Sequence, residues 1–488
     1  MKFLSALFFL YFFSSCAVVK KADPNKKFGP DQLKADYNLF KNILEEQHPG
    51  LYWYTSKDSM NFYFQKGEAM LKDSLTENSF KNVLSYVVAK IKCGHTTVRS
   101  SKAMARRSAG RFFPLVIKAW PDTAIVTTSL FRKDSIISRG ALLTAIENRS
   151  INSIIDTMFQ YLSADGHNMT HKYQTLSNRG VFGSMYASLF GARPRYQVNY
   201  IDTSGERRTA SVPLFTILPD STRRIQRPPM PQPSPRERKK QRLDGNRMLR
   251  FDTTLSMAIM DLNTFANGYR LHRFIKSSFK KLKERNIENL VIDLRANGGG
   301  SVTNSNLLTK YISNKSFKIA DSLYAIKRSS RYGKYQKDRL GNWLFLQFMT
   351  HKQKDGNYHF GLFERKFFKP KKKDHFDEQL YILTGGNTFS ASTLFTVVVK
   401  DQRNVTVVGE ETGGGAYGNN AWLIPDVTLP ITKLRFRLPL FRLVINKNLP
   451  KNGRGIFPEV ESLPTVNDIR NGVDYKMEKV RSLIKASH

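Results

Sequence analysis

The chain is short of cysteine, of acidic residues and of long apolar runs. Its 2 cysteines, Cys16 and Cys93, in 488 residues exclude a fold held together by a disulfide framework. Its 40 acidic residues face 78 lysines and arginines, a formal net charge of +38, so a polyanion-binding surface has to be considered. Because the basic residues are spread along the chain, they favour a solvated surface instead. Apolar residues make up 40 % of the chain, enough for two or three domains with cores of their own.

The apolar stretch at the N-terminus, residues 3–13, is too short to cross a bilayer. One lysine precedes it, and small residues and then Cys16 follow, which is the layout of a secretory signal. Small residues that end at a cysteine resemble a bacterial lipoprotein signal, with Cys16 as the acylated first residue of the mature chain. The sequence therefore predicts an exported lipoprotein of the bacterial cell envelope, and a plain signal peptide is the alternative.

The chain also lacks the common cofactor motifs. No cluster of histidine, cysteine and acidic residues has metal-ligand spacing, and no Gly-Lys-Ser/Thr follows a glycine-rich loop, so we expect neither a metal nor another cofactor. GGGAYG (413–418) fits the glycine pattern of dinucleotide-binding folds, but polar residues separate it from its strand and no helix follows. SSFK (277–280) fits the serine-x-x-lysine pattern, but it lies in a basic amphipathic helix without the partner motifs.

The first half of the chain shows three successive patterns. Residues 31–92 carry apolar residues at helical spacing, with a stop at His48-Pro49-Gly50. Short apolar runs broken by turns follow up to residue 215, with one helix after a tight turn at Asn148-Arg149, and they indicate a small barrel-like β module. The basic, proline-rich stretch 223–242 predicts an extended linker without a core. Because it has no interleaved aromatic residues, we expect no specific nucleic-acid partner.

From residue 251 strands alternate with helices, which predicts an α/β core with a mostly parallel sheet. A basic, aromatic insertion interrupts this core at about 328–376. In such sheets the active groups gather beyond the carboxyl ends of the strands. Two predicted strand exits carry suitable chemistry, DLRANGGGS (293–301) and TGGNTFSAS (384–392).

The serine motif has two interpretations. A helix that begins near Ser390 places its hydroxyl at the positive helix end and leaves the Ala391 N–H without an intrahelical partner. Gly299 or Gly300 could supply a second oxyanion donor. Serine is also a preferred helix N-cap, so the motif alone leaves capping and catalysis open. A nucleophilic serine needs a base, and His95 in CGHTTV is one candidate, with lysine as the alternative.

Five motifs together resemble the tail-specific (C-terminal processing) serine peptidases, and most closely their tricorn-like, retinoid-binding-protein-related branch. They run in order along the chain: CGHTTV, VIDLRANGGG, ILTGGNTFSAST, VVGEETGGG and GRGIFPEVE. The resemblance implies an α/β fold, with a crotonase-like α/β core, an N-terminal helical region and an inserted PDZ-like β module. The implied division is 1–22 for the lipoprotein-type signal peptide and tether start, 23–110 for the helical region, 111–215 for the PDZ-like domain, 216–250 for the basic linker, 251–475 for the catalytic core and 476–488 for a C-terminal tail.

The resemblance also implies roles for single residues. The family nucleophile is the first serine of Ser-Ala-Ser, here Ser390, and the oxyanion donors fall at Gly299 and Ala391. Many members use a lysine as base at the place where this chain has Gly415, which rules out the usual serine–lysine pair. The tricorn-like branch instead uses a histidine from the N-terminal region, which matches His95.

Members often carry an acidic residue before the final glycine-x-glycine that helps to orient the base. Asn452 stands there, so Glu411 and Glu410 are further candidates for that role. The function implied is a serine endopeptidase that cleaves polypeptides through an acyl-enzyme, without a cofactor, on a membrane-anchored protein. A catalytically inactive peptide-binding protein on the same fold is the alternative, because Gly415 and Asn452 depart from the family pattern. A basic surface protein that binds polyanions is a third hypothesis.

Overall fold

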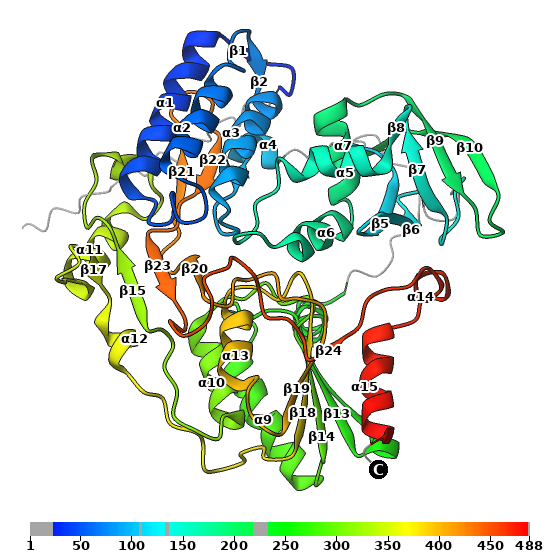
Figure 1. Ribbon diagram of the computed structural model, residues 1–488, viewed down its shortest axis with the longest axis vertical. Coiled ribbons are helices and arrows are strands. Elements are labelled where there is room, and N and C mark those ends of the chain that lie inside the picture. Colours follow the sequence, from blue (N-terminus) through cyan, green and yellow to red (C-terminus); the bar gives the residue numbers. More distant parts are fainter. Residues whose placement is uncertain (1–22, 107–109, 132–135, 218–232, 487–488) are drawn as a thin grey trace, which may run out of the picture.

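The computed structural model describes residues 23–106, 110–131, 136–217 and 233–486. Cys16 and the predicted signal peptide lie outside these residues. Within them, no helix is both long and apolar enough to span a membrane. The protein is a mixed α/β protein, as expected, with helices at the N-terminus, an antiparallel β sheet beside them and a mostly parallel sheet below (Figure 1).

Three long helices dominate the N-terminal region: α1 (Pro30–Gln47), α2 (Lys57–Glu68) and α3 (Glu77–Ile91). Helix α1 stops where predicted, because Pro49 disfavours helical backbone in the residue before it. Ser56 and Thr76 begin α2 and α3 by accepting backbone N–H groups as N-caps. The prediction of a helical region is therefore confirmed.

The next region contains an antiparallel sheet whose order is β10-β9-β7-β6-β5. Its strands are β5 (Leu115–Trp120), β6 (Thr123–Ser129), β7 (Leu142–Ile146), β9 (Arg195–Ile201) and β10 (Arg207–Pro213). The tight turn lies one residue earlier than the predicted Asn148-Arg149: Glu147 and Asn148 form it, with φ of 50° and 61°, and Arg149 already pairs with Ile146. A PDZ-like classification of this sheet stays a prediction.

The prediction of one helix in this region is wrong, because its described residues form three. They are α5 (Ile151–Phe159), α6 (Met169–Ser177) and α7 (Val181–Phe190). Only α5 has a clear apolar stripe in the sequence, whereas α6 is largely polar and α7 is apolar on most sides. Periodicity alone therefore did not reveal α6 and α7.

The linker prediction is wrong from residue 235 on. Helix α8 (Pro235–Asp244) begins at Ser234, whose hydroxyl accepts the Glu237 N–H while the Glu237 carboxylate accepts the Ser234 N–H. This reciprocal cap starts a helix even in a strongly basic segment. Only Leu243 of α8 is buried, so the segment has no core of its own, as expected.

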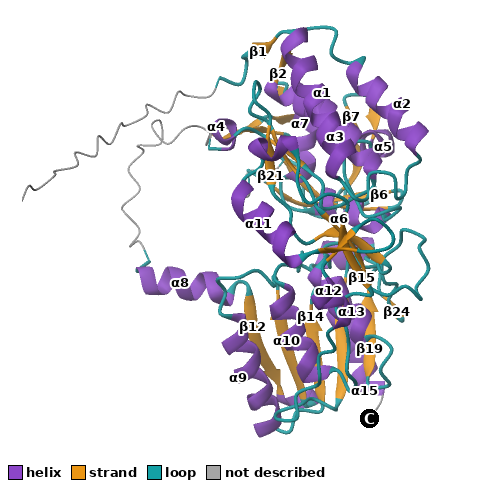
Figure 2. Ribbon diagram, turned by 90° about the vertical axis from the view of Figure 1, so that its left-hand side faces the viewer, coloured by secondary structure: helices purple, strands orange, loops and turns teal. Residues whose placement is uncertain are grey.

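The lower sheet has the order β12-β13-β14-β18-β19-β24 and is parallel except for the edge strand β12. The strands are β12 (Arg247–Asp252), β13 (Met257–Leu262), β14 (Asn289–Asp293), β18 (Gln379–Thr384), β19 (Val405–Gly409) and β24 (Val460–Glu461). Helices α9 (Leu271–Glu284), α10 (Val302–Ile312) and α13 (Ala391–Val399) cover one face (Figure 2). The mostly parallel α/β core is therefore confirmed.

The other face of this sheet is covered by α15 (Tyr475–Ala486) (Figure 1). Met477, Val480 and Ile484 of α15 are buried against the strands. The expectation that 476–488 is a tail is therefore wrong as far as residue 486. The three side chains lie three and four places apart, the spacing of one helix face, and burying them holds the helix on the sheet.

The insertion and part of the segment after β19 form a third layer between the helices and the lower sheet (Figure 1). Its main sheet combines β16 (His351–Lys352), β17 (Tyr358–His359), β15 (Ser322–Ala325), β23 (Phe441–Val444) and β20 (Gly418–Ala421). A smaller sheet, at the level of α1 to α3 in Figure 1, joins β21 (Asp426–Thr428) and β22 (Arg435–Arg437) to β3 (Val98–Arg99), which begins at the last residue of the CGHTTV motif. Helices α11 (Arg339–Met349) and α12 (Gly361–Arg365) complete the layer.

Candidate active site

Ser390 lies at the exit of β18 and is the N-cap of α13, which begins at Ala391. Its backbone has φ 56° and ψ −118°, a conformation that costs a residue with a side chain about 1–3 kcal/mol. Its side chain makes no capping hydrogen bond, and none to any other described residue. Capping therefore does not explain Ser390, whose hydroxyl is available for chemistry.

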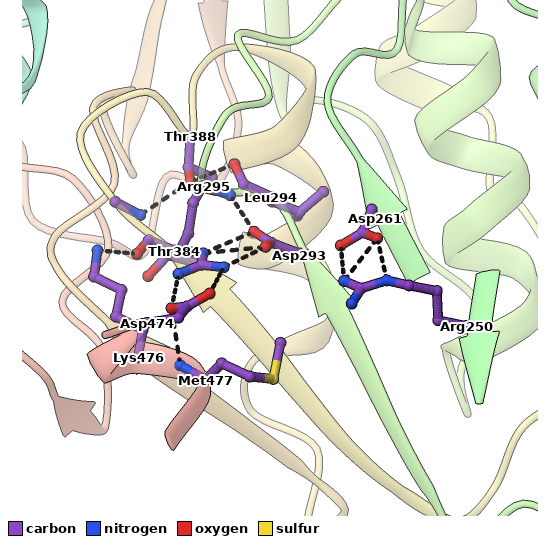
Figure 3. A network of polar contacts seen from close by, with 11 residues as sticks. Arg250, Asp261, Asp293, Leu294, Arg295, Thr384, Thr388, Asp474, Lys476 and Met477 are labelled. Carbon is purple, nitrogen blue, oxygen red and sulfur yellow. Dashed lines mark hydrogen bonds and ion pairs between the residues drawn. The ribbon is translucent and has the colours of Figure 1, made fainter. Parts of the chain in front are cut away.

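Hydrogen bonds lock the serine loop onto the glycine loop that follows β14. The Thr388 hydroxyl donates to the Leu294 carbonyl at 2.9 Å and accepts the Gly385 N–H at 3.1 Å (Figure 3). The Phe389 N–H donates to the Asn297 carbonyl at 3.1 Å. The loops after β14 and β18, which the sequence indicated as candidate sites, are therefore held together by hydrogen bonds.

Gly299 lies directly against the candidate nucleophile. Its φ is 93°, and a Cβ added to it would lie 2.7 Å from the Ser390 Cβ and 2.9 Å from the Ala391 nitrogen. A residue with a side chain does not fit here. The Gly299 N–H itself donates to the Asn297 Oδ1 at 2.9 Å, so it is not the free donor that was expected. The N–H groups of Ala391 and Gly300 have no hydrogen-bond partner among the described residues.

A charged network supports the glycine loop from the side of α15. The Arg295 guanidinium binds the carboxylates of Asp293 and Asp474, the latter at the start of α15 (Figure 3). Next to it, the Lys476 ammonium donates to the Thr384 carbonyl at 3.0 Å, at the end of β18. Helix α15 thus fixes both strand exits and is part of the framework of the site.

His95 lines the same cavity as Ser390, and this cavity has a volume of about 1030 Å³. Its side chain is buried, and its ring packs on the Phe389 ring with centroids 4.7 Å apart. No hydrogen bond joins His95 to Ser390, and the buried Nδ1 has no partner among the described residues. Burial, and then the charges of Arg437 and His171, lower the pKa of His95 to about 3.

The loop that carries His95 is held from three sides. The Gly94 N–H donates to the Asp165 carboxylate at 2.8 Å, and the Thr96 hydroxyl is 2.8 Å from the His48 Nε2. The Arg437 N–H donates to the Thr97 carbonyl at 2.9 Å. This loop therefore connects the N-terminal helices to the segment between α5 and α6 and to β22.

Asp165 is a buried residue of the site region that no sequence motif indicated. Besides the Gly94 N–H, its carboxylate accepts the Gly415 N–H at 3.3 Å. Burial raises the pKa of Asp165 to about 6, against the opposing effect of these hydrogen bonds. Asp165 thus connects the His95 loop to the loop after β19.

The residues expected to orient the base do not reach His95. The Glu411 carboxylate accepts hydrogen bonds from the Arg454 guanidinium at 2.9 and 2.7 Å and from the Gly455 N–H at 2.7 Å. Glu410 forms an ion pair with Lys476, and the Asn452 Oδ1 accepts the Arg454 N–H at 3.0 Å. Because these groups bind other partners, none of the three residues contacts His95 to orient its ring.

A second histidine, His171 of α6, lines the cavity and was missed by sequence reasoning. Its Nδ1 lies 2.6 Å from the Gly386 carbonyl, and its ring stacks on Phe389 with centroids 5.0 Å apart. A carbonyl only accepts, so Nδ1 carries the proton and Nε2 of the neutral ring can accept one. Burial lowers the pKa of His171, which favours the neutral form. Its surroundings in the sequence, NMTHKY, carry no motif that could have revealed it.

Gly415, which replaces the usual lysine, is fixed by its surroundings. A Cβ at this position would lie 2.7 Å from the Gly418 carbonyl oxygen. The backbone therefore leaves no room for a side chain, and a base has to come from elsewhere. Within the described part of the chain, no three histidine, cysteine or acidic side chains come together as a metal site.

Comparisons with known proteins agree with this architecture. The model of peptidase family S41 matches residues 256–462. The crystal structure of mature CPAF is 15 % identical with a TM-score of 0.62, over 93 % of this chain and 97 % of that chain. Mature CPAF complexed with lactacystin is 15 % identical with a TM-score of 0.64, over 94 % and 98 %. At these identities the two structures show a shared fold. No curated protein matches the sequence significantly.

Proposed function

We propose that the chain, whose residues 256–462 match the model of peptidase family S41, is a serine peptidase in which Ser390 is the nucleophile and His95 the general base. One observation carries the proposal. The Ser390 hydroxyl, at a strained N-cap, makes no hydrogen bond to any residue that the structure describes, and it shares its cavity with His95. Strained backbone of this kind persists where the surrounding structure enforces it, and it is concentrated at functional sites.

The proposed reaction is acyl transfer. His95 accepts the Ser390 proton as the hydroxyl oxygen attacks a peptide carbonyl, and the tetrahedral intermediate then collapses with loss of the amine, which His95 protonates. Water, deprotonated by His95, hydrolyses the ester and restores the serine. The hydrogen bond between Ser390 and His95 forms in the substrate complex, since catalytic hydrogen bonds often tighten only there.

The oxyanion of this intermediate would be held by backbone N–H groups. The N–H groups of Ala391 and Gly300 are unpartnered within the described part of the chain, and that of Ala391 also lies at the positive end of α13. Gly299 would not donate to the oxyanion, as the family pattern implies, because its N–H already binds Asn297. Its missing side chain keeps the space in front of the Ala391 nitrogen open.

The rest of the proposal concerns the substrate and the setting. A polypeptide in extended form would reach the cavity with help from the antiparallel sheet β10-β9-β7-β6-β5, by strand addition. The protein would work outside the cytoplasm, in the cell envelope, with a lipid on Cys16 as its membrane anchor. The layout of residues 1–16 supports this part of the proposal.

A fluorophosphonate probe tests the nucleophile. It should label the wild-type protein, and Ser390→Ala should abolish labelling. Ser392→Ala is the matched control, because Ser392 lies two places along α13, is fully buried and has an unbonded hydroxyl. Labelling that persists in Ser390→Ala would sink the assignment. A wild-type protein that binds peptides but is never labelled would instead be the peptide-binding protein of the alternative hypothesis.

A further inference from the structure

Arg437 is the one residue with a fixed charge among the described residues that line the cavity. Lysine, aspartate and glutamate are absent from that lining, which otherwise consists of glycine, polar and apolar residues and the two histidines. Among the described residues, the cavity that Ser390 lines thus carries a single permanent positive charge. A ligand group with a negative charge would be attracted here, and a cationic one repelled.

The guanidinium of Arg437 has no hydrogen bond or ion pair with any described residue. The Asp426 carboxylate, whose charge acts on Arg437, pairs instead with Arg99 at 3.4 Å and Arg435 at 3.5 Å. Burial lowers the pKa of Arg437, followed by the effect of the Arg99 charge, yet arginine remains charged. A partly buried and unpaired guanidinium is unfavourable in the free protein, and a bound carboxylate would remove that penalty.

The position of Arg437 ties it to the catalytic machinery. It ends β22, and its backbone N–H binds the Thr97 carbonyl two residues after His95. Apolar side chains from the insertion and from the segment after β20, among them Phe345, Phe363 and Trp422, line the same cavity. The space therefore combines an apolar wall with a cation.

We propose that Arg437 is a specificity-determining residue that binds a carboxylate of the peptide substrate. The substrates would be peptides with a carboxylate near an apolar residue at the cleavage site. A glutamate or aspartate side chain and a free C-terminus both offer this group, and both suit the planar fork of arginine. The proposal rests on the function proposed above, since it assigns the substrate class of that site.

Binding of this carboxylate would also assist the base. The Arg437 charge is one cause of the lowered pKa of His95. A carboxylate that neutralises the charge moves the pKa of His95 back toward its ordinary value, so the ring accepts a proton more readily. Acidic substrates would gain in kcat as well as in KM.

Binding to the full-length Ser390→Ala variant tests the proposal independently of catalysis. The probes are fluorescent peptides of one apolar sequence in four forms, with a glutamate or a glutamine at a scanned position and a free or an amidated C-terminus. We expect the form with the preferred carboxylate to bind roughly ten- to a hundredfold more tightly than its neutral partner. The pair that shows the difference tells a side-chain carboxylate from a terminal one.

Variants in the same background then identify the residue. Arg437→Gln should abolish the preference, and Arg437→Glu should turn it toward a lysine-containing peptide. Arg99→Gln is the control, because it removes a cation from the same small sheet but does not line the cavity, and it should keep the preference. Equal binding of all four forms, or a preference that survives Arg437→Gln, would overturn the proposal. Failure of the fluorophosphonate test with an intact binding preference would refute only the catalytic assignment.

Discussion

The ring of His95 packs against the ring of Phe389, with centroids 4.7 Å apart and planes at 44°. Phe389 directly precedes Ser390, so an aromatic contact, not a hydrogen bond, connects the proposed base to the proposed nucleophile. His171 stacks on the same phenyl ring. Two histidine rings with different surroundings therefore line one cavity, and substituting each in turn distinguishes their roles.

His95→Ala should lower kcat by about 10²–10⁴, the usual contribution of a general base. His171→Asn should stay within about tenfold of wild type, because its amide can still donate to the Gly386 carbonyl. Cleavage of a fluorogenic peptide, together with the rate of fluorophosphonate labelling, measures both effects. The reverse pattern would give the role of base to His171.

Gly299→Ala should lower kcat by about 10²–10³, the cost of losing an oxyanion donor, because the new Cβ would crowd the Ala391 nitrogen and Ser390. Gly298→Ala is the matched control. Gly298 is the neighbouring glycine, it has no positive φ, and a Cβ there meets no atom within 4 Å. Steady-state cleavage of both variants is compared, with circular dichroism to confirm folding. Equal activity of the two variants would contradict the proposed position of the oxyanion.

Gly415→Lys should not restore a serine–lysine pair, although it recreates the residue that many relatives use. Its Cβ would collide with the Gly418 carbonyl, so the backbone has to shift and the hydrogen bond to Asp165 is strained. We expect a loss of stability of about 1–3 kcal/mol and no gain of activity. Gly341→Lys, on the exposed side of α11 where a Cβ has open space, should be neutral in urea unfolding. A more active Gly415→Lys protein would refute this account.

The free energy of unfolding should decrease as the pH falls below about 6.5. Burial lowers the pKa of His48 and of His95 to about 3, so between these values the unfolded chain binds protons that the folded protein does not. Each such histidine costs about 1.4 kcal/mol per pH unit across this window. Asp165 acts in the opposite direction, because its raised pKa of about 6 stabilises the folded protein as the pH falls toward 4.

His48→Gln should therefore reduce the loss of stability between pH 6 and pH 4 by about 1.4 kcal/mol per pH unit. Urea unfolding at both pH values measures this dependence. The exposed His272 is the control residue, and His272→Gln should leave the pH dependence as it is in the wild type. A dependence that is the same in all three proteins would show that His48 does not titrate in the way its burial implies.

The sequence by itself determined the local framework of the site. Helical spacing predicted α1 to α3, apolar runs predicted β13, β14, β18 and β19, and glycines and serines at two strand exits indicated Gly299 and Ser390. These features can be predicted from the sequence because periodicity, turn chemistry and strand exits depend on residues that are close in the chain. The helix start at Ala391 followed for the same reason.

The tertiary structure alone decided which side chains meet. Asp165 binds Gly415 across 250 residues, and His171 binds the Gly386 carbonyl across 215 residues. The same packing engaged Glu411 with Arg454 and left Arg437 unpaired beside His95. Such contacts depend on how sheets and helices from distant segments pack, and on which partner satisfies each buried polar group. Neither can be read from local residue patterns.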